Sequence, residues 1–358
     1  MKFDSKEITK VGEYTPEGVM APSIDKYDTP ITPRENYLRI YRGEKPEWIP
    51  MTCDCIVFNP NIYADNVARA TVCEADKSIT GREGGTHKDI FGIDWVFVPE
   101  VGGSMVKPGN PILEDANDWE EVIKFPNMDE WDWEGCAERN RGIYFDTDRT
   151  TYMWIFNGMF ERLISFMEAQ WALVALVDED QKEAVKALFS RLCDFYDDLI
   201  GRFHKYFHVD VIHFHDDWGS QRAPLFSIET VREMIAPYIK RVVESCHKRG
   251  IIFDFHCCGK NEMLVPAMIE CGIDSWGGQL CNDFDYLYET YGDKIILGIG
   301  PDKIRQQVDR EEALASGKRF AEKYAYNMDK KPIYAVMRRV TPDLREGVYT
   351  ETRKVLGQ

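Results

Sequence analysis

The sequence has no apolar run of about 18 residues, the length that an α-helix needs to cross a bilayer. Residues 1–10 are polar and charged, whereas a secretory signal would contain an apolar stretch. Basic residues are also scarce, with 44 Lys and Arg against 61 Asp and Glu and a formal net charge of −17. This charge disfavours nucleic acid and anionic membranes as partners, because few cations are available to neutralise phosphates. The sequence therefore predicts a cytoplasmic protein that binds a small molecule or another protein.

Other absences narrow the fold and the use of cysteine. No internal repeat or low-complexity segment is present, and no Gly-x-Gly-x-x-Gly turn follows the first predicted strand, so a dinucleotide-binding fold has little support. The ten cysteines are scattered along a chain that lacks a secretory signal. They are therefore expected to be reduced thiols or metal ligands and not a disulfide framework.

Strand-like and helical patterns alternate along most of the chain. Residues 179–207 and 229–249 carry apolar side chains at the three-to-four spacing of a helix with one buried face, and Gly250 follows the second of them as a helix cap. The helical patterns separate most of the apolar or β-branched runs, which lie at residues 48–52, 152–156, 209–214, 251–255, 273–276, 295–299 and 333–337.

Strands that alternate with helices of this length indicate a parallel sheet. Seven strands are clear, and residues 93–98 can supply an eighth. We therefore predict an α/β protein with a single (β/α)8 TIM barrel over residues 46–358. Residues 1–45, which contain a short helical stretch at 33–42, form an N-terminal extension packed on the barrel. Residues 99–133 are rich in Gly, Pro, Asp and Asn, which predicts a long loop region with short strands.

Polar residues at one strand end suggest a metal site, since active sites of such barrels lie at the carboxyl ends of the strands. Residues 253–259 read Phe-Asp-Phe-His-Cys-Cys-Gly, so Asp254, His256 and Cys258 share one face. The Cα atoms of His256 and Cys258 would lie roughly 7 Å apart, close enough for both side chains to bind one ion such as Zn²⁺. The alternative is a buried cysteine beside a hydrogen-bonded histidine.

A second strand end, residues 211–219, holds two histidines, two carboxylates and a tryptophan. Side chains alternate between the two faces of a strand, so either His213 and His215 point into the barrel or Phe214 and Asp216 do. Asp216 or Asp217 can instead cap the following helix. We expect at least one of the polar residues here to be functional.

Three smaller features also end predicted strands. Asn157 can direct its amide into the site, and the glycines after Trp276 leave room for a flat ligand. Arg338 and Arg339 can hold a substrate carboxylate with a guanidinium fork. Each feature has an equally good structural explanation, as a helix cap, a turn or a surface ion pair.

Several of these segments resemble the uroporphyrinogen-decarboxylase superfamily. The resemblance runs from Pro46 to the C-terminus and is carried by residues 156–162 (FNGMFER), 215–220 (HDDWGS) and 256–259 (HCCG), and by Pro237-Tyr238. The decarboxylases have an Arg-Gln-Ala-Gly-Arg block after the first strand, where this chain reads Met-Thr-Cys-Asp-Cys-Ile at residues 51–56. A porphyrin tetracarboxylate would find no arginine there, so decarboxylation is the less favoured function.

The methyltransferase branch of this superfamily is similar in its His-x-Cys, here His256 and Cys258, which in that branch binds Zn²⁺. Thiol-methylating members carry a further Cys on the last strand, but this chain has no Cys after Cys281. A closer resemblance is to the methyltransferases of anaerobic O-demethylase systems, which pass a methyl group from an aryl methyl ether to a corrinoid protein. In some of these a Glu-x14-Glu-x20-His pattern is associated with zinc, and Glu168, Glu183 and His204 reproduce the spacing. Glu183 and His204 lie near opposite ends of one predicted helix, about 30 Å apart, and are not expected to share an ion.

The resemblance implies methyl transfer from a guaiacol- or vanillate-like ether to the Co(I) of a separate corrinoid protein. The expected partners are that protein, an aromatic methyl donor and a second copy of the chain in a homodimer. Methylamine, betaine, methanol or thiol donors are alternatives. The phenolate needs a proton or a Lewis acid as it leaves. The residues expected to serve the reaction are His256 and Cys258 through a metal, or Asp216, His215 or His256 as proton donor, with Asn157, Phe156, Trp218, Trp276 and Arg338 around the substrate.

Overall fold

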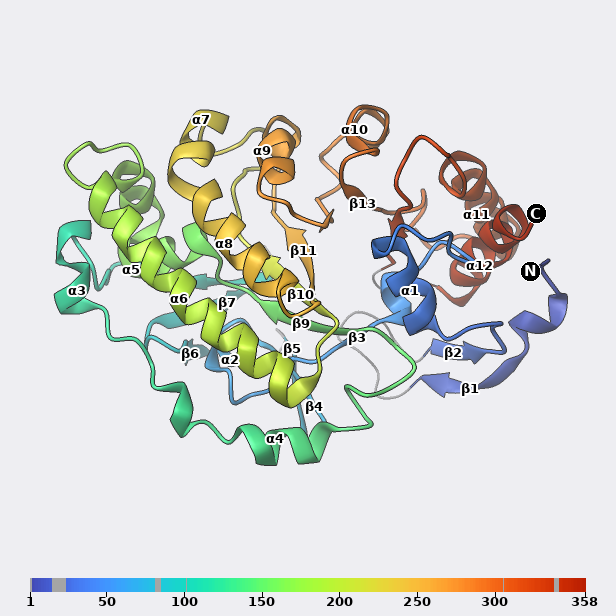
Figure 1. Cartoon of the computed structure of the whole chain (residues 1–358), viewed down its shortest axis with the longest axis horizontal. Helices are drawn as coiled ribbons and strands as arrows, with labels where there is room; N and C mark the ends of the chain where they lie inside the picture. The colour runs from blue at the N-terminus through green and yellow to red at the C-terminus, as the bar shows by residue number, and fades with distance from the viewer. Residues whose placement is uncertain (1, 15–23, 81–84, 101, 305, 338–340) are drawn as a thin grey trace.

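A curved, parallel seven-stranded sheet forms the centre of the protein in the computed structural model (Figure 1), which describes residues 2–14, 24–80, 85–100, 102–304, 306–337 and 341–358. A parallel bridge joins Met51, which precedes the strand at one edge, to Ala335 in the strand at the other edge. The two edges of the sheet therefore approach each other, as in a TIM barrel. In spatial order the strands are β14 (Tyr334–Ala335), β13 (Ile296–Ile299), β12 (Ser275–Trp276), β11 (Ile252–His256), β10 (Val211–His215), β9 (Thr151–Ile155) and β3 (Ile56–Val57).

Six of the seven clear strands predicted from the sequence are confirmed within one or two residues, and the first is shorter than expected. Of residues 48–52 only Met51 bridges the sheet; a 3-10 turn, η2 (Thr52–Asp54), follows, and pairing with β9 resumes at β3.

The prediction that residues 93–98 supply the eighth barrel strand is wrong. These residues do form a strand, β7 (Asp94–Val98), but it pairs antiparallel with β6 (Thr86–Lys88) and β8 (Gly103–Val106) in a separate small sheet. Only one residue of β7 is buried, whereas all five of β9 are. Strands of a parallel barrel are covered on both faces, and β7 is not.

Helices cover one side of the sheet, with α5, α6, α8 and α9 lying next to one another in Figure 1. The predicted apolar stripe of α6 is confirmed, since Leu188, Leu192, Leu199 and Phe203 are fully buried. The helices are α2 (Ala64–Ala68), α3 (Trp119–Val122), α4 (Trp133–Asn140), α5 (Met159–Ala175), α6 (Lys182–Phe207), α7 (Ile228–Thr230), α8 (Ala236–His247), α9 (Val265–Glu270), α10 (Phe284–Tyr291), α11 (Arg310–Tyr324) and α12 (Pro342–Leu356), with a π-helical turn (Val231–Ile235) between α7 and α8.

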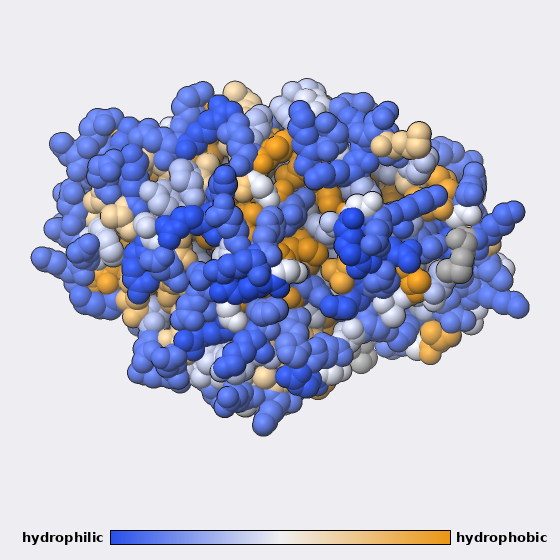
Figure 2. Space-filling view, viewed as in Figure 1, coloured by the Kyte–Doolittle hydropathy of each residue, from blue (hydrophilic) through white to orange (hydrophobic). Residues whose placement is uncertain are grey.

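Gly250 follows α8 with a φ of +71°, the conformation expected of a glycine that ends a helix. Within the described ranges no helix is both long and apolar enough to span a membrane. Figure 2 shows a largely hydrophilic face on which hydrophobic residues are visible mainly near the centre.

The N-terminal segment contributes the hairpin β1 (Lys10–Tyr14) and β2 (Ile24–Tyr27) and the predicted helix α1 (Pro33–Tyr41). Helix α1 contacts the amino ends of the barrel strands. The Arg34 guanidinium donates two hydrogen bonds, of 2.6 and 3.0 Å, to Asp210 just before β10, and the hydroxyls of Tyr41 and Ser275 lie 2.9 Å apart. With α1 over the amino ends, the carboxyl ends are the remaining place for a site. The hairpin β4 (Thr71–Glu74) and β5 (Lys77–Thr80) lies outside the barrel sheet.

Candidate functional site

The alternating side chains of β10 are oriented so that its histidines point into the barrel. His213 Nδ1 lies 2.6 Å from Asp254 Oδ2 of β11, and the His215 ring stacks on that of His256 with centroids 5.2 Å apart. The strand register pairs His215 directly with His256. Phe214 points the other way and packs against Tyr196 of α6. The sequence left two orientations of this strand open, and the one in which the histidines face inward is therefore correct.

Four side chains at the carboxyl ends of β10 and β11 form a compact group, here called the four-residue cluster. Its ligand atoms all lie within 4.8 Å of one another, and in the described part of the chain it is the one such group that could hold a metal ion. The cluster consists of His215, Asp217, His256 and Cys258.

The spacing of the cluster fits a tetrahedral ion. His215 Nε2 lies 3.3 Å from Asp217 Oδ1, and His256 Nε2 lies 3.4 Å from Cys258 Sγ. Ligands bound at about 2.0–2.3 Å in a tetrahedron are separated by roughly 3.3–3.7 Å. Two imidazoles, a carboxylate and a thiolate are a ligand set that suits Zn²⁺.

Backbone carbonyls orient both histidines of the cluster. His215 Nδ1 lies 3.1 Å from the carbonyl oxygen of Phe156, and His256 Nδ1 lies 2.6 Å from that of Gly277. A carbonyl only accepts, so each Nδ1 carries the proton, and in the neutral ring Nε2 carries the lone pair. Metal-binding histidines usually have this arrangement, because the outer hydrogen bond fixes the tautomer and the ring orientation.

The electrostatics of the cluster also suit a cation. Burial, followed by the charge of Arg69, lowers the pKa of His215 to about 3, so its Nε2 lone pair faces the Asp217 carboxyl at neutral pH. Burial raises the pKa of both Asp217 and Cys258. Electron-rich atoms that face one another at this distance need a proton or a cation between them. The residues present therefore fit a zinc ion, which would also convert the thiol to a thiolate.

Hydrogen bonds join the loops that carry the cluster. The backbone N–H of Cys258 donates to Asp217 Oδ1 at 2.7 Å, and Gln279 Nε2 donates to Cys258 Sγ at 3.0 Å. Gln279 Oε1 in turn accepts from the backbone N–H of Gly259 at 3.0 Å. The cluster is thus held by the ends of three strands, β10, β11 and β12.

Gly259 is the tightest point of this arrangement. Its φ is +93°, and an added Cβ would lie 2.3 Å from the carbonyl carbon of Gly219 and 2.5 Å from its oxygen. We expect Gly259→Ala to lower the free energy of unfolding by about 2–4 kcal/mol, because both the backbone strain and the clash must be relieved. Gly250→Ala is the matched control, since Gly250 also has a positive φ but open space around it, and should cost about 1 kcal/mol. Urea denaturation of both variants measures the difference; equal losses would contradict the close crossing of the two loops.

Three of the predicted site residues lie away from the cluster. Asp216 is fully buried on the outer side of the sheet, where it accepts from the backbone N–H groups of Phe160 and Glu161 at 3.2 and 2.8 Å. It thus caps the start of α5, the preceding helix and not the following one, and burial raises its pKa to about 7. Trp218 and Trp276 are fully buried and pack on Phe255 and Phe284 respectively, as parts of the hydrophobic core.

Phe156 and Asn157 do lie beside the site. The Phe156 ring is 6.2 Å from that of His215 by centroids, so it is an aromatic wall next to the cluster. Asn157 is fully buried; its Oδ1 accepts from Arg69 at 3.1 Å and its Nδ2 donates to Asp65 at 3.1 Å. Its amide supports neighbouring charged residues. Arg338 and Arg339 lie outside the described residues.

The triplet of Glu168, Glu183 and His204 is not brought together. Glu183 is highly exposed and pairs with Lys186, while Glu168 accepts from the backbone N–H groups of Gly109 and Asn110. Helix α6 is continuous from Glu183 to His204, about 30 Å at 1.5 Å per residue. The prediction that these residues do not share an ion is confirmed.

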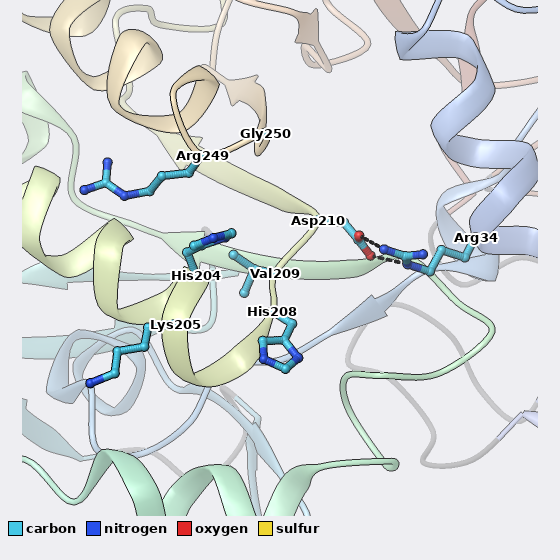
Figure 3. Close-up of a pocket in the computed structure, with 8 residues that line it drawn as sticks. All are labelled: Arg34, His204, Lys205, His208, Val209, Asp210, Arg249 and Gly250. Carbon is cyan, nitrogen blue, oxygen red and sulfur yellow. Dashed lines mark hydrogen bonds and ion pairs between the residues drawn. The ribbon is translucent and has the colours of Figure 1, made fainter.

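His204 instead lines a hollow near the amino end of β10, with a volume of about 420 Å³ (Figure 3). Three of its basic side chains already have acidic partners: Arg34 pairs with Asp210, His208 with Asp146 and Arg249 with Asp197. This hollow is at the end of the strands opposite the cluster.

The residues predicted from the sequence did not include Asp217 as a possible ligand, nor Arg69 and Glu161 beside the site. A signal for Asp217 was present, because His215-x-Asp217 and His256-x-Cys258 have the same spacing at the ends of consecutive strands. In-register parallel pairing brings two such motifs together. No comparable signal marked Arg69, which comes from a short helix far along the chain from these strands.

Comparison with known proteins shows the fold. No protein-family model and no curated protein matches the chain. Among solved structures, a methyltransferase from Methanosarcina mazei superposes with a TM-score of 0.53 over 91% of this chain and 98% of that one, at 11% sequence identity. A B12-independent methionine synthase from Shewanella sp. W3-18-1 superposes with a TM-score of 0.42 over 75% of this chain and 74% of that one, at 12% identity. The chain thus shares a TIM-barrel-like α/β fold with the Methanosarcina methyltransferase.

Proposed function

We propose that the chain is a zinc-dependent methyltransferase that passes a methyl group from an aryl methyl ether to the Co(I) of a corrinoid protein. The observation that carries the proposal is the four-residue cluster at the carboxyl ends of β10 and β11, where barrel enzymes have their active sites. Residues 156–162, 215–220 and 256–259 resemble the uroporphyrinogen-decarboxylase superfamily, and His256-x-Cys258 resembles its methyltransferase branch. This resemblance supports the same proposal, as does the fold.

The difficult part of this reaction is the leaving group. The methyl–oxygen bond breaks with its electron pair on the phenolate oxygen, while Co(I) supplies the pair for the new bond to carbon. A zinc ion held by three of the four residues would leave one position for the ether oxygen, and so would supply the Lewis acid that stabilises the developing phenolate. Asp216 is an unsuitable proton donor for this step, because both its carboxylate oxygens accept hydrogen bonds at the start of α5. His215 serves better as a ligand, since its Nδ1 proton is committed to a carbonyl.

The side chains around the cluster suit an aromatic donor. The Phe156 ring lies against that of His215. Trp154, in β9, contacts the Phe156 ring edge to face, with the ring centroids 5.1 Å apart. Phe156 therefore remains a proposed wall of the donor site, as the sequence predicted, and Trp154 takes the place of Trp218 and Trp276. His213, held by Asp254, keeps 9% of its side chain exposed two residues below His215, so the accessible interior of the barrel extends to it.

Mixing the protein, supplied with Zn²⁺, with a reduced corrinoid protein and a panel of donors tests the proposal. We expect absorbance to change from that of Co(I) to that of methyl-Co(III) with guaiacol-type ethers, and no change with methanol, methylamine or betaine. Conversion with one of these other donors instead would retain the methyltransferase and replace the substrate class. Failure with every donor and a competent corrinoid protein would overturn the proposal.

A further inference from the structure

Arg69, which follows α2, lies close to the four-residue cluster. Its guanidinium carbon is 5.5 Å from the centre of the Phe156 ring, and that ring is 6.2 Å from the ring of His215. The positive charge of Arg69 adds to the lowering of the pKa of His215 and opposes the rise that burial causes in the pKa of Asp217 and Cys258. Arg69 is therefore within electrostatic reach of three members of the cluster.

The side chain of Arg69 is held firmly. It is only 10% exposed, and its guanidinium lies over the rings of both Phe156 and Trp95, with the carbon 4.8 Å from the centre of the Trp95 ring. Its Nη1 donates to Glu161 at 3.0 Å and to Asn157 at 3.1 Å. A charged group fixed in this way is oriented before any ligand arrives.

Half of the guanidinium has no protein partner. Among the described residues, only Nη1 of Arg69 forms hydrogen bonds, although the group has five N–H donors. Neither Nε nor Nη2 is among the fully buried polar atoms that lack a partner, so both reach accessible space. Together Nε and Nη2 form one edge of the planar fork, the geometry that binds a carboxylate through two parallel hydrogen bonds.

We propose that Arg69 forms an anion subsite that binds a carboxylate on the methyl donor, and so selects aryl ethers that carry one. This inference rests on the proposed function, because it names the substrate class of the same site. The role is the one that the sequence analysis gave to Arg338 at the last strand, here moved to a residue with the required open edge. Glu161 holds one edge of the guanidinium, and the substrate carboxylate takes the other.

Calorimetric titration of the zinc-loaded protein with three probes tests the subsite without requiring turnover. The probes are 3-methoxybenzoate, methoxybenzene and benzoate, of which the first two differ only in the carboxylate. We expect the native protein to bind 3-methoxybenzoate at least about tenfold more tightly than methoxybenzene, as charge-assisted hydrogen bonds allow. In Arg69→Gln this preference should vanish, while binding of methoxybenzene stays within about twofold.

Two further variants keep the test decisive. Arg69→Lys retains a cation for Glu161 and so preserves the fold, but it lacks the fork and should bind 3-methoxybenzoate about tenfold more weakly. Arg241→Gln removes an exposed arginine that pairs with Asp194 on the outside of α6, and should bind all three probes as the native protein does. Folded Arg69→Gln and Arg69→Lys proteins that keep the native preference would overturn the subsite.

The binding data separate this inference from the proposed function. Arg69-dependent binding of benzoate, with no methyl transfer from any ether, would support an anion subsite and reject the reaction. Equal methyl transfer from 3-methoxybenzoate and methoxybenzene in the native protein and in Arg69→Gln would support the reaction and reject the subsite.

Discussion

Cys258→Ala is expected to release the metal and to slow methyl transfer by about a thousandfold. Lewis-acid stabilisation of a leaving oxygen is worth several kcal/mol, and about 4 kcal/mol of transition-state energy corresponds to a factor of about 10³. Cys258 supplies the one soft ligand of the cluster, and Gln279 already donates a hydrogen bond to its sulfur. Removing the sulfur leaves a site of nitrogen and oxygen ligands that holds Zn²⁺ much more weakly.

Metal content and spectroscopy measure this loss independently of activity. The native protein should bind about one zinc ion per chain, and Cys258→Ala less than about a tenth of that at the same free zinc concentration. Substituted with Co²⁺, the native protein should show a thiolate-to-cobalt charge-transfer absorption that the variant lacks. Cys281→Ala is the matched control, since this partly exposed cysteine stands outside the cluster. A native protein that binds no zinc or cobalt would reject the metal site altogether.

Much of the barrel follows from local sequence patterns. The apolar stripe of α6 and the short apolar runs that form β10, β11 and β13 are set by burial. A half-buried helix carries apolar residues with a period of 3.6, whereas a strand covered on both faces is a continuous apolar run. The failure at β7 has the same origin. A short apolar run predicts a strand but not its partners, and β7 pairs with its neighbours in sequence through local turns instead of joining the barrel.

The site was harder to predict because burial does not reveal which way a barrel strand faces. Four of the five residues of β10 are buried, so the inner and outer faces differ little in character. Sequence spacing correctly joined His256 to Cys258, but it left His215 and Asp216 as equal candidates. The pairing with β11 shows that His215 faces inward. The hydrogen bond from the backbone N–H of Glu161 shows that Asp216 caps α5.

Aromatic residues pose the same difficulty. Trp218 and Trp276 follow strand ends just as pocket residues would, yet both side chains lie in the core between the sheet and the helices. A large ring at a strand end serves packing and ligand binding equally well, so its type carries little information about its direction. Arg69 follows the short helix α2 and does not stand at the end of a barrel strand, so it has no strand-end signal at all.

Arg162→Met is expected to lower the free energy of unfolding by about 3–5 kcal/mol, the largest loss of stability that we predict. Arg162 on α5 is fully buried and joins the carboxylates of Asp65 and Asp89, with its Nη1 2.7 Å from Asp89 Oδ2. Both acidic side chains are themselves fully buried. Without the guanidinium, two carboxylates would remain in the interior with no opposing charge, which costs more than the ion pairs contribute. Urea denaturation at neutral pH measures the loss. Arg202→Met, which removes a partly exposed arginine paired with Asp129 and Asp198, should cost no more than about 1 kcal/mol.

The pH dependence of this variant identifies the cause of the loss. Burial raises the pKa of Asp89 even beside Arg162, and removal of the guanidinium should raise it further. The folded variant would then bind a proton that the unfolded chain has released, so its stability relative to the native protein must fall as pH rises. We therefore expect the difference between Arg162→Met and the native protein to be smaller at about pH 5 than at about pH 8. A loss of stability that stays constant across this range would instead indicate altered packing of α5, because the cost of a cavity or a steric clash does not depend on protonation.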